Sequence, residues 1–212
     1  MVRLFDATRL GLGFVLALPI WLAISESFTP AGETSKPKPL VVRSLALNDA
    51  HGQPVKRDEV LKSKVTVLLF LSTDCPVANA YTPLLARLAE NYGSRGVAFY
   101  GVHCDPDATP QAALDHAREY GLPFPLLLDP TQTLPPQTGV RVTPEAVVLN
   151  GKGEVVYHGR IDNRYTERGK RRAEVTVHDL EASLEASLVG AALPTSTAEA
   201  FGCPLPPPRK GP

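Results

Sequence analysis

An unbroken run of apolar and β-branched residues, Val65–Leu71 (VTVLLFL), restricts the folds open to this chain more than any other segment. Such a run is typical of a strand buried on both faces, which occurs mainly in parallel sheets covered by helices. Apolar residues then recur at helical spacing from Tyr81 to Tyr92, and Gly93 is a helix stop signal. The chain is therefore predicted to have an α/β fold.

The pattern continues as alternating strands and helices. Further strands are predicted at 97–102, 126–128, 146–149 and 155–157, and further helices at 109–120 and 179–189. Helical connections imply right-handed crossovers between parallel strands, whereas the segment Gly151–Gly153 marks a hairpin that adds antiparallel strands. Another hairpin is predicted between 41–47 and Val55. The expected fold is a central mixed sheet flanked by helices, with an N-terminal β-hairpin extension.

The two ends of the chain differ in composition from the middle. Arg3 and Arg9 precede an apolar run, 10–24, that is short for a membrane span, so residues 1–27 are predicted to be a signal peptide or a membrane anchor. Either would export the rest to the periplasm or cell envelope, and an uncleaved segment would tether it to the membrane. The other predicted divisions are a Pro-rich linker at 28–39, one domain at 40–192, and a Pro-rich tail without regular structure at 193–212.

Composition narrows the function classes. The 22 basic and 22 acidic residues balance, so no overall positive charge indicates nucleic-acid binding. Neither a glycine-rich phosphate loop nor a flavin motif occurs, and no organic cofactor is expected. The cysteines are Cys75, Cys104 and Cys203, and an odd number leaves at least one outside any intramolecular pair. Which two would pair is open at this stage.

Cys75 occupies the point where the first buried strand gives way to the first helix. Pro76 suits the first helical turn, which puts Cys75 at or near the N-cap. Unpaired backbone N–H groups and the positive end of the helix dipole favour a thiolate there and lower its pKa. An ionised Asp74 would act in the opposite sense, but solvent would screen it at an exposed position. We therefore expect a reactive thiol, against the alternative of a small, inert core residue.

Three features resemble thioredoxin-fold redoxins of the alkyl hydroperoxide reductase/thiol-specific antioxidant type. They are the segment STDCP at 72–76, the segment VTP at 142–144, and the order of strands and helices between Pro39 and Gly190. A later GRID segment, 159–162, occurs in exported proteins of this kind. The resemblance implies that Pro144 is a cis-proline beside the active thiol.

The sequence also departs from the patterns of that family. Ala78 replaces the second cysteine of a C-x-x-C motif, so a disulfide within the motif is excluded. Ser72 occupies the position of the threonine that holds peroxide in P-x-x-x-T-x-x-C, and Leu68 replaces its proline. The family also places an arginine beside the thiolate, for which Arg141 and Arg160 are the candidates.

The resulting hypothesis is an exported thiol-dependent oxidoreductase that acts on peroxide or disulfide substrates and receives electrons from an exported dithiol donor. Cys75 would be the nucleophile, and either Cys203 in the tail or Cys104 at the end of the second strand would resolve the intermediate, with Cys203 slightly favoured. One alternative is a non-catalytic binding module with a structural Cys75–Cys203 disulfide. Another is copper binding or delivery through Cys75, Cys104 and His103. The remaining histidines are expected at the surface or at helix caps.

Overall fold

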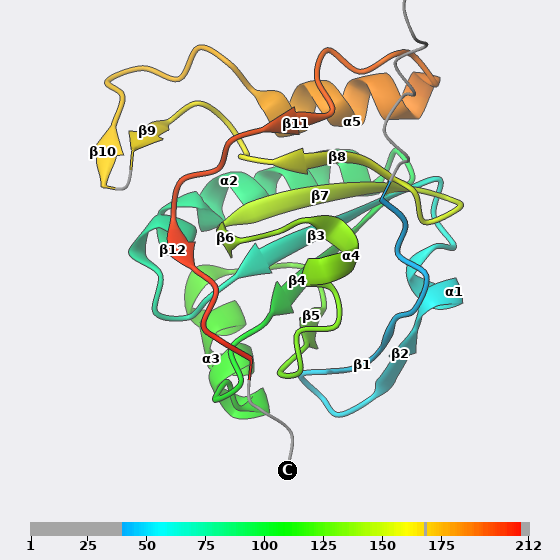
Figure 1. Ribbon diagram of the computed structural model, residues 1–212, viewed down its shortest axis with the longest axis vertical. Coiled ribbons are helices and arrows are strands. Elements are labelled where there is room, and N and C mark those ends of the chain that lie inside the picture. Colours follow the sequence, from blue (N-terminus) through cyan, green and yellow to red (C-terminus); the bar gives the residue numbers. More distant parts are fainter. Residues whose placement is uncertain (1–39, 168, 209–212) are drawn as a thin grey trace, which may run out of the picture. The chain divides into compact units, whose positions relative to one another are not determined.

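The computed structural model describes residues 40–167 and 169–208 (Figure 1). Its helices are α1 (Arg57–Val60), α2 (Pro76–Gly93), α3 (Pro110–Tyr120), α4 (Pro135–Thr138) and α5 (Asp179–Val189). Its strands are β1 (Ala46–Asp49), β2 (Pro54–Lys56), β3 (Val65–Leu71), β4 (Val97–His103), β5 (Leu126–Leu128), β6 (Val142–Thr143), β7 (Glu145–Asn150), β8 (Val155–Gly159), β9 (Tyr165–Glu167), β10 (Lys170–Arg171), β11 (Thr197–Ala198) and β12 (Cys203–Pro204).

The central sheet is mixed, as predicted. Its strand order is β11-β8-β7-β3-β4-β5-β1-β2, and every residue of β3 is buried. Strands β3, β4 and β5 run parallel, whereas β7 is antiparallel to β3 and β8 is antiparallel to β7. The predicted N-terminal hairpin forms from β1 and β2, and β1 joins the sheet through an antiparallel pairing with β5. The thioredoxin-like α/β fold is confirmed.

Each face of the sheet has its own core. Alternate residues of β3 point to opposite faces, so Val67 and Leu69 pack with residues of α2, α3 and α5, while Leu68 and Phe70 pack with the segment 42–47, α1 and the start of α4. Figure 1 shows β3 inside this arrangement of helices. Cys75 belongs to the first core and Cys104 to the second. The two cysteines therefore lie on opposite faces of the sheet.

Local sequence signals define the longest helices. Pro76 begins α2, and the buried face of this helix carries apolar and aromatic side chains at three- and four-residue spacing, including Tyr81, Leu85 and Leu88. Thr109 caps α3 by accepting a hydrogen bond from the Ala112 N–H at 3.1 Å. The helices predicted from the sequence at these places are confirmed.

The tail departs from the prediction. It was expected to lack regular structure, yet β11 pairs in parallel with β8 and β12 pairs antiparallel with β6. The physical reason is that the edges of β6 and β8 carry backbone groups that need hydrogen-bond partners, and the tail supplies them. In Figure 1 the tail is the red segment that runs from β11 beside β8 to β12 beside β6.

The predicted signal peptide or anchor, 1–27, and the predicted linker, 28–39, lie outside the described residues. Within residues 40–167 and 169–208, no helix has the length and apolar character needed to span a bilayer.

Candidate active site

Cys75 lies at the N-cap of α2, where the sequence predicts it. Its N–H donates to the Ser72 carbonyl oxygen at 3.4 Å, and its own carbonyl oxygen accepts from the Asn79 N–H at 3.0 Å. The Ala78 N–H donates to the Cys75 sulfur at 3.4 Å. The first turn of the helix therefore aims a backbone dipole at the sulfur, which stabilises negative charge there.

The loop that contains Pro144 forms the second wall of the site. The Thr143–Pro144 peptide bond is cis, as the family resemblance implied. The Cys75 thiol donates to the Thr143 carbonyl oxygen at 3.1 Å. The chain thus brings two segments together, 72–78 and 143–144, that are far apart in the sequence.

The tail supplies the third wall. Strand β12 pairs with β6 in a register that sets Cys203 opposite Thr143. From this position both the side chain and the backbone of Cys203 lie close enough to the Cys75 sulfur to lower the pKa of that thiol. All three cysteines are thiols in this structure. The arrangement therefore brings two thiols together without joining them.

These contacts shift the acidity of Cys75. Burial alone would raise the pKa of this thiol, since only 1% of the residue is exposed. Interactions with the Cys203 side chain, the Ala78 N–H, the Thr143 side chain and the Cys203 backbone act in the opposite direction, and the pKa is lowered overall. The charged form of Cys75 is favoured by specific donors rather than by exposure to water.

Cys104 is placed very differently. It is buried in the second core, and its sulfur lies 4.0 Å from the Asp129 carboxylate. Burial first, and the negative charge of Asp129 second, raise the pKa of Cys104. The copper hypothesis needed Cys104, His103 and Cys75 to converge, but Cys104 and Cys75 occupy opposite faces. No group of three or more metal-ligating His, Cys, Asp or Glu side chains occurs within 40–167 and 169–208, so this ligand set is not assembled.

The arginines predicted beside the thiolate have other contacts. Arg160 pairs with Asp179, with Nε 2.7 Å from Oδ2, and so holds the first residue of α5. Arg141 is exposed, and its backbone N–H donates to the Glu145 carboxylate at 3.0 Å. Neither arginine is among the principal groups that shift the pKa of Cys75. A role of either arginine beside the thiolate stays a prediction, and the partner of Arg160, Asp179, belongs to a helix that is distant in sequence.

Ser72, expected to offer a hydroxyl group to peroxide, is half-buried at the end of β3. Its contact with Cys75 is made by the backbone carbonyl oxygen, as described above. The part that its hydroxyl would play with a bound peroxide stays a prediction.

The GRID segment, 159–162, acts as a structural junction. Gly159 touches the tail at Ala198, and Arg160 pairs with α5. The Ile161 carbonyl oxygen accepts from the Leu180 N–H at 3.0 Å, and the buried Asp162 accepts from the Tyr81 hydroxyl at 2.5 Å. These contacts join β8, α5, α2 and the tail.

A buried pair of histidines near the site was missed. His116 was expected at the surface or at a cap, but it is buried and its Nε2 lies 2.9 Å from Asn79 Oδ1. Asn79 in turn donates to the Thr73 carbonyl oxygen at 3.0 Å, which links the pair to the segment that precedes Cys75. The ring of His103 meets that of His116 edge-on, with centroids 5.6 Å apart. One signal was available, because His116 falls three residues after the small residue Ala113 on the inner face of α3.

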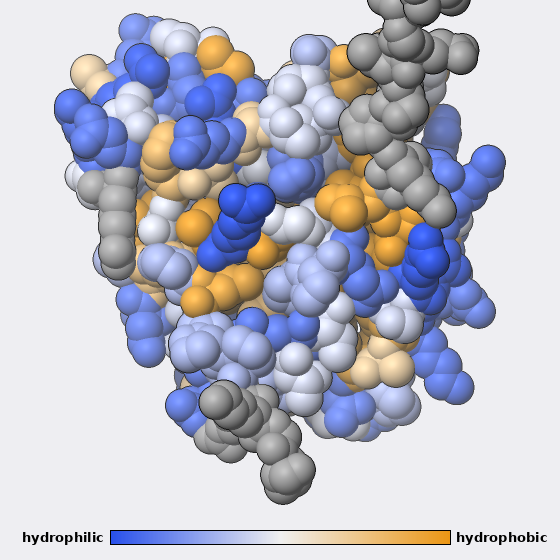
Figure 2. Space-filling model, viewed as in Figure 1, coloured by the Kyte–Doolittle hydropathy of each residue, from blue (hydrophilic) through white to orange (hydrophobic). Residues whose placement is uncertain are grey.

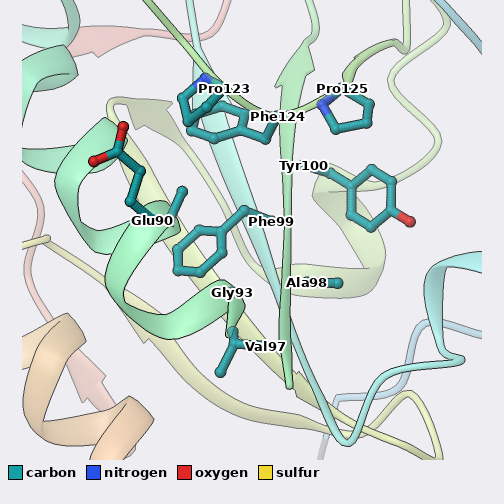
Figure 3. A pocket seen from close by; sticks show the side chains of 10 residues that line it. Glu90, Gly93, Val97, Ala98, Phe99, Tyr100, Pro123, Phe124 and Pro125 are labelled. Atoms are coloured by element: carbon teal, nitrogen blue, oxygen red, sulfur yellow. The ribbon is translucent and has the colours of Figure 1, made fainter. Parts of the chain in front are cut away.

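A separate pocket lies at the far end of the strands. Figure 3 shows Phe99, Phe124 and neighbouring side chains around a hollow of about 410 Å³ beside the end of α2. It includes Val97, the first residue of β4, which pairs with Val65 at the beginning of β3. Because Cys75 follows the opposite end of β3, this pocket is not part of the thiol site.

Comparison with known proteins agrees with this architecture. The model of the Redoxin family matches residues 27–181. Thiol-disulfide oxidoreductase ResA of Halalkalibacterium halodurans is 30% identical over 114 residues, which are 53% of this chain and 62% of that protein. This chain therefore matches less than two thirds of that relative's length.

Solved structures share the fold. An uncharacterized conserved protein from Geobacillus kaustophilus aligns with a TM-score of 0.70 and 27% identity, over 80% of this chain and 91% of that one. A protein from Chlorobium tepidum assigned as a thiol:disulfide interchange protein DsbE aligns with a TM-score of 0.57 and 21% identity, over 73% and 99%. At 21% identity, the similarity to the Chlorobium tepidum protein supports the fold alone. Since the family model spans well over half of the sequence, the chain belongs to the Redoxin family.

Proposed function

We propose that this protein is a thiol-dependent oxidoreductase in which Cys75 is the nucleophile and Cys203 the resolving cysteine. The observation that carries the proposal is the contact between the two thiols at the N-terminus of α2, where hydrogen bonds lower the pKa of Cys75. A lowered pKa together with a second thiol in contact is what dithiol–disulfide chemistry requires. The name of the ResA relative is consistent with this class of reaction.

The reaction with a disulfide proceeds in two exchanges. The Cys75 thiolate attacks one sulfur of the substrate disulfide, and the other sulfur leaves as a thiolate that takes up a proton. Cys203, once deprotonated, then attacks the Cys75 sulfur and expels the second substrate thiol. The substrate gains two electrons and two protons, and the enzyme is left with a Cys75–Cys203 disulfide.

The reaction with a hydroperoxide gives the same enzyme product. The Cys75 thiolate attacks the terminal oxygen, the O–O bond breaks, and the alcohol or water leaves after protonation. Cys75 is now a sulfenic acid, and Cys203 condenses with it to form the disulfide and release water. Ser72 is proposed to help hold the peroxide.

Reduction by an exported dithiol donor would begin at Cys203. This residue is partly exposed in strand β12, whereas Cys75 is buried. Attack on the Cys203 sulfur also makes Cys75 the leaving group, and a thiol with a lowered pKa leaves faster. Export to the periplasm or cell envelope, with a membrane tether if residues 1–27 are retained, is the cellular setting we propose.

The contact between the thiols also favours a second candidate, a non-catalytic module in which Cys75–Cys203 is a permanent staple. Nearly complete burial of Cys75 fits a structural disulfide as well as a redox one. The two candidates differ in reducibility. A catalytic disulfide forms and opens under mild conditions, whereas a staple resists mild dithiols.

Mass-spectrometric mapping of the full chain tests the proposal. The reduced protein is treated with one equivalent of hydrogen peroxide or of a small disulfide, and the sulfur linkages are mapped before and after a dithiol is added. We expect a Cys75–Cys203 bond that forms and reverses. Cys203→Ala should leave Cys75 as a sulfenic acid or a mixed disulfide, and Cys104→Ala is the matched control that should leave the bond intact. A reduced protein in which Cys75 reacts with neither oxidant would refute the proposal.

A further inference from the structure

The tail segment 197–206, here named the strap, is fixed to the domain at two places. Its first anchor is β11, in which Thr197 and Ala198 pair with His158 and Gly159 of β8. Its second anchor is β12, which pairs with β6 directly beside Cys75. Residues between the anchors pass a hollow of about 430 Å³ that is lined on one side by β6 and β8 and on the other by strap residues 197–200.

Both anchors depend on a glycine. At Gly202 a Cβ atom would stand 2.0 Å from the Thr143 carbonyl oxygen, a distance that real Cβ atoms do not reach. At Gly159 a Cβ would stand 2.0 Å from the Ala198 carbonyl oxygen, and φ is +144°. The strap backbone therefore lies closer to the domain at these points than any residue with a side chain would allow.

The end of the strap is held as well. The Leu205 N–H donates to the Arg141 carbonyl oxygen at 3.0 Å, and the Leu205 side chain packs against the second core. Gln132 donates its side-chain amide to the Pro206 carbonyl oxygen at 2.6 Å. Figure 2 shows apolar side chains in the middle of the face that the strap crosses in Figure 1. The second anchor thus extends from Gly202 to Pro206.

The anchored strap limits what can reach Cys75. Only 1% of this residue is exposed, and the strap contacts its sulfur through Cys203. The edge of β6 beside Cys75 is already occupied by the backbone of β12, so a protein disulfide that approached along this edge would have to displace it.

We propose that the strap selects substrates by size, with Gly202 as the positioning residue that keeps it closed. While β12 is paired with β6, Cys75 reacts with small hydroperoxides and low-molecular-weight disulfides. Disulfides on proteins reach it only after β12 leaves β6, with β11 retained as the attachment. This inference rests on the proposed function, since it assumes that Cys75 is the redox thiol.

Two maleimides that share one reactive group test whether the closed strap acts as a size-selective gate in front of Cys75, here called the gate. N-ethylmaleimide is the small probe, and a maleimide on a long polyethylene glycol chain is the large one. Labelling of Cys75 is followed by peptide mapping in the reduced full chain with Cys203→Ser, which removes the competing thiol and keeps the strap. The rate for each probe is divided by its rate with glutathione, so that the intrinsic reactivity of each probe cancels.

Gly202→Ala should open the gate. It should raise labelling by the large probe about fivefold or more, the factor expected from losing one ordinary hydrogen bond. Gly93→Ala is the matched control, because a Cβ at Gly93 meets no atom within 4 Å. Thermal unfolding of both variants checks that the domain remains folded.

Three outcomes separate the two proposals. The gate is supported if the parent reacts faster with the small probe, if Gly202→Ala abolishes this preference, and if Gly93→Ala keeps it. Equal normalised rates for both probes in the parent would overturn the gate and leave the proposed function standing. If N-ethylmaleimide labels Cys75 neither in the parent nor in either variant, the proposed function is overturned, and with it the gate.

Discussion

His103 makes the stability of this protein sensitive to mild acid. The residue ends β4, is 1% exposed, and its Nε2 has no hydrogen-bond partner among residues 40–167 and 169–208. Burial, and to a lesser extent the neighbouring His116, lowers the pKa of His103 from 6.5 to about 4. Between these two values the unfolded chain binds a proton at this position and the folded chain does not. The free energy of unfolding therefore falls as the pH drops from about 6.5 to about 4.

The size of the effect follows from the two pKa values. A fall from 6.5 to about 4 corresponds to about 3 kcal/mol at ~1.4 kcal/mol per pH unit. This is a large part of the stability of an ordinary domain, ~5–15 kcal/mol. Above about pH 6.5 this histidine contributes no pH dependence, because it is neutral in both states.

Urea unfolding followed by circular dichroism, at a series of pH values from about 7 to about 4, measures the effect. The wild-type chain is compared with His103→Leu, which fills the site with an apolar side chain that does not titrate. Carboxylates that do not contact His103 contribute to both profiles and cancel in the difference. We expect the wild type to lose about 3 kcal/mol more than the variant over this range. Parallel profiles would show that His103 is not buried in its neutral form and would refute the reasoning.

Three further outcomes are expected. Alkylation of Cys75 should have its midpoint below the pH typical of a free cysteine, and Cys203→Ala should move that midpoint upward because a hydrogen bond to the thiolate is lost. Arg160→Ala should reduce stability by about 2 kcal/mol, between the values for exposed and buried ion pairs, and should leave alkylation of Cys75 unchanged. A rise in the alkylation midpoint would mean that Arg160 does act on the thiolate. Oxidation should join Cys75 to Cys203 in the folded chain and mainly to Cys104 in urea, as disulfide mapping would detect.

The sequence predicts the framework well because the signals for it are local. The run Val65–Leu71 can be buried only as a central strand, and proline or glycine marks the ends of α2 and α3. Cys75 was located by the same logic, since the junction of a buried strand and a helix is visible in a short window of sequence. What a few neighbouring residues specify can be read without a structure.

The contacts around Cys75 could not be predicted in this way, because segments that are distant in sequence make them. Strand β12 has two residues, too few for any periodic pattern, and its partner β6 is equally short. Gly202 and Gly159 carry the information about close approach, but a single glycine in a sequence does not say which backbone will approach it. The ion pair of Arg160 was missed for the same reason, since nothing near it in sequence indicates Asp179.

The distance in sequence between the two thiols has a consequence of its own. In a C-x-x-C motif one helical turn holds both sulfurs, so even a partly folded chain can pair them. Here Cys75 and Cys203 are separated by 128 positions, and Cys75 and Cys104 by 29. Loop-closure entropy therefore favours Cys75–Cys104 in the unfolded chain about ninefold, the ratio of the two loop lengths raised to the power of about 1.5.

The folded chain reverses this preference, because it buries Cys104 on the opposite face of the sheet and brings Cys203 to Cys75. A switch of the main disulfide from Cys75–Cys203 to Cys75–Cys104 on unfolding would show that tertiary structure chooses the partner thiol. The same disulfide under both conditions would mean that something other than the docked strap decides it.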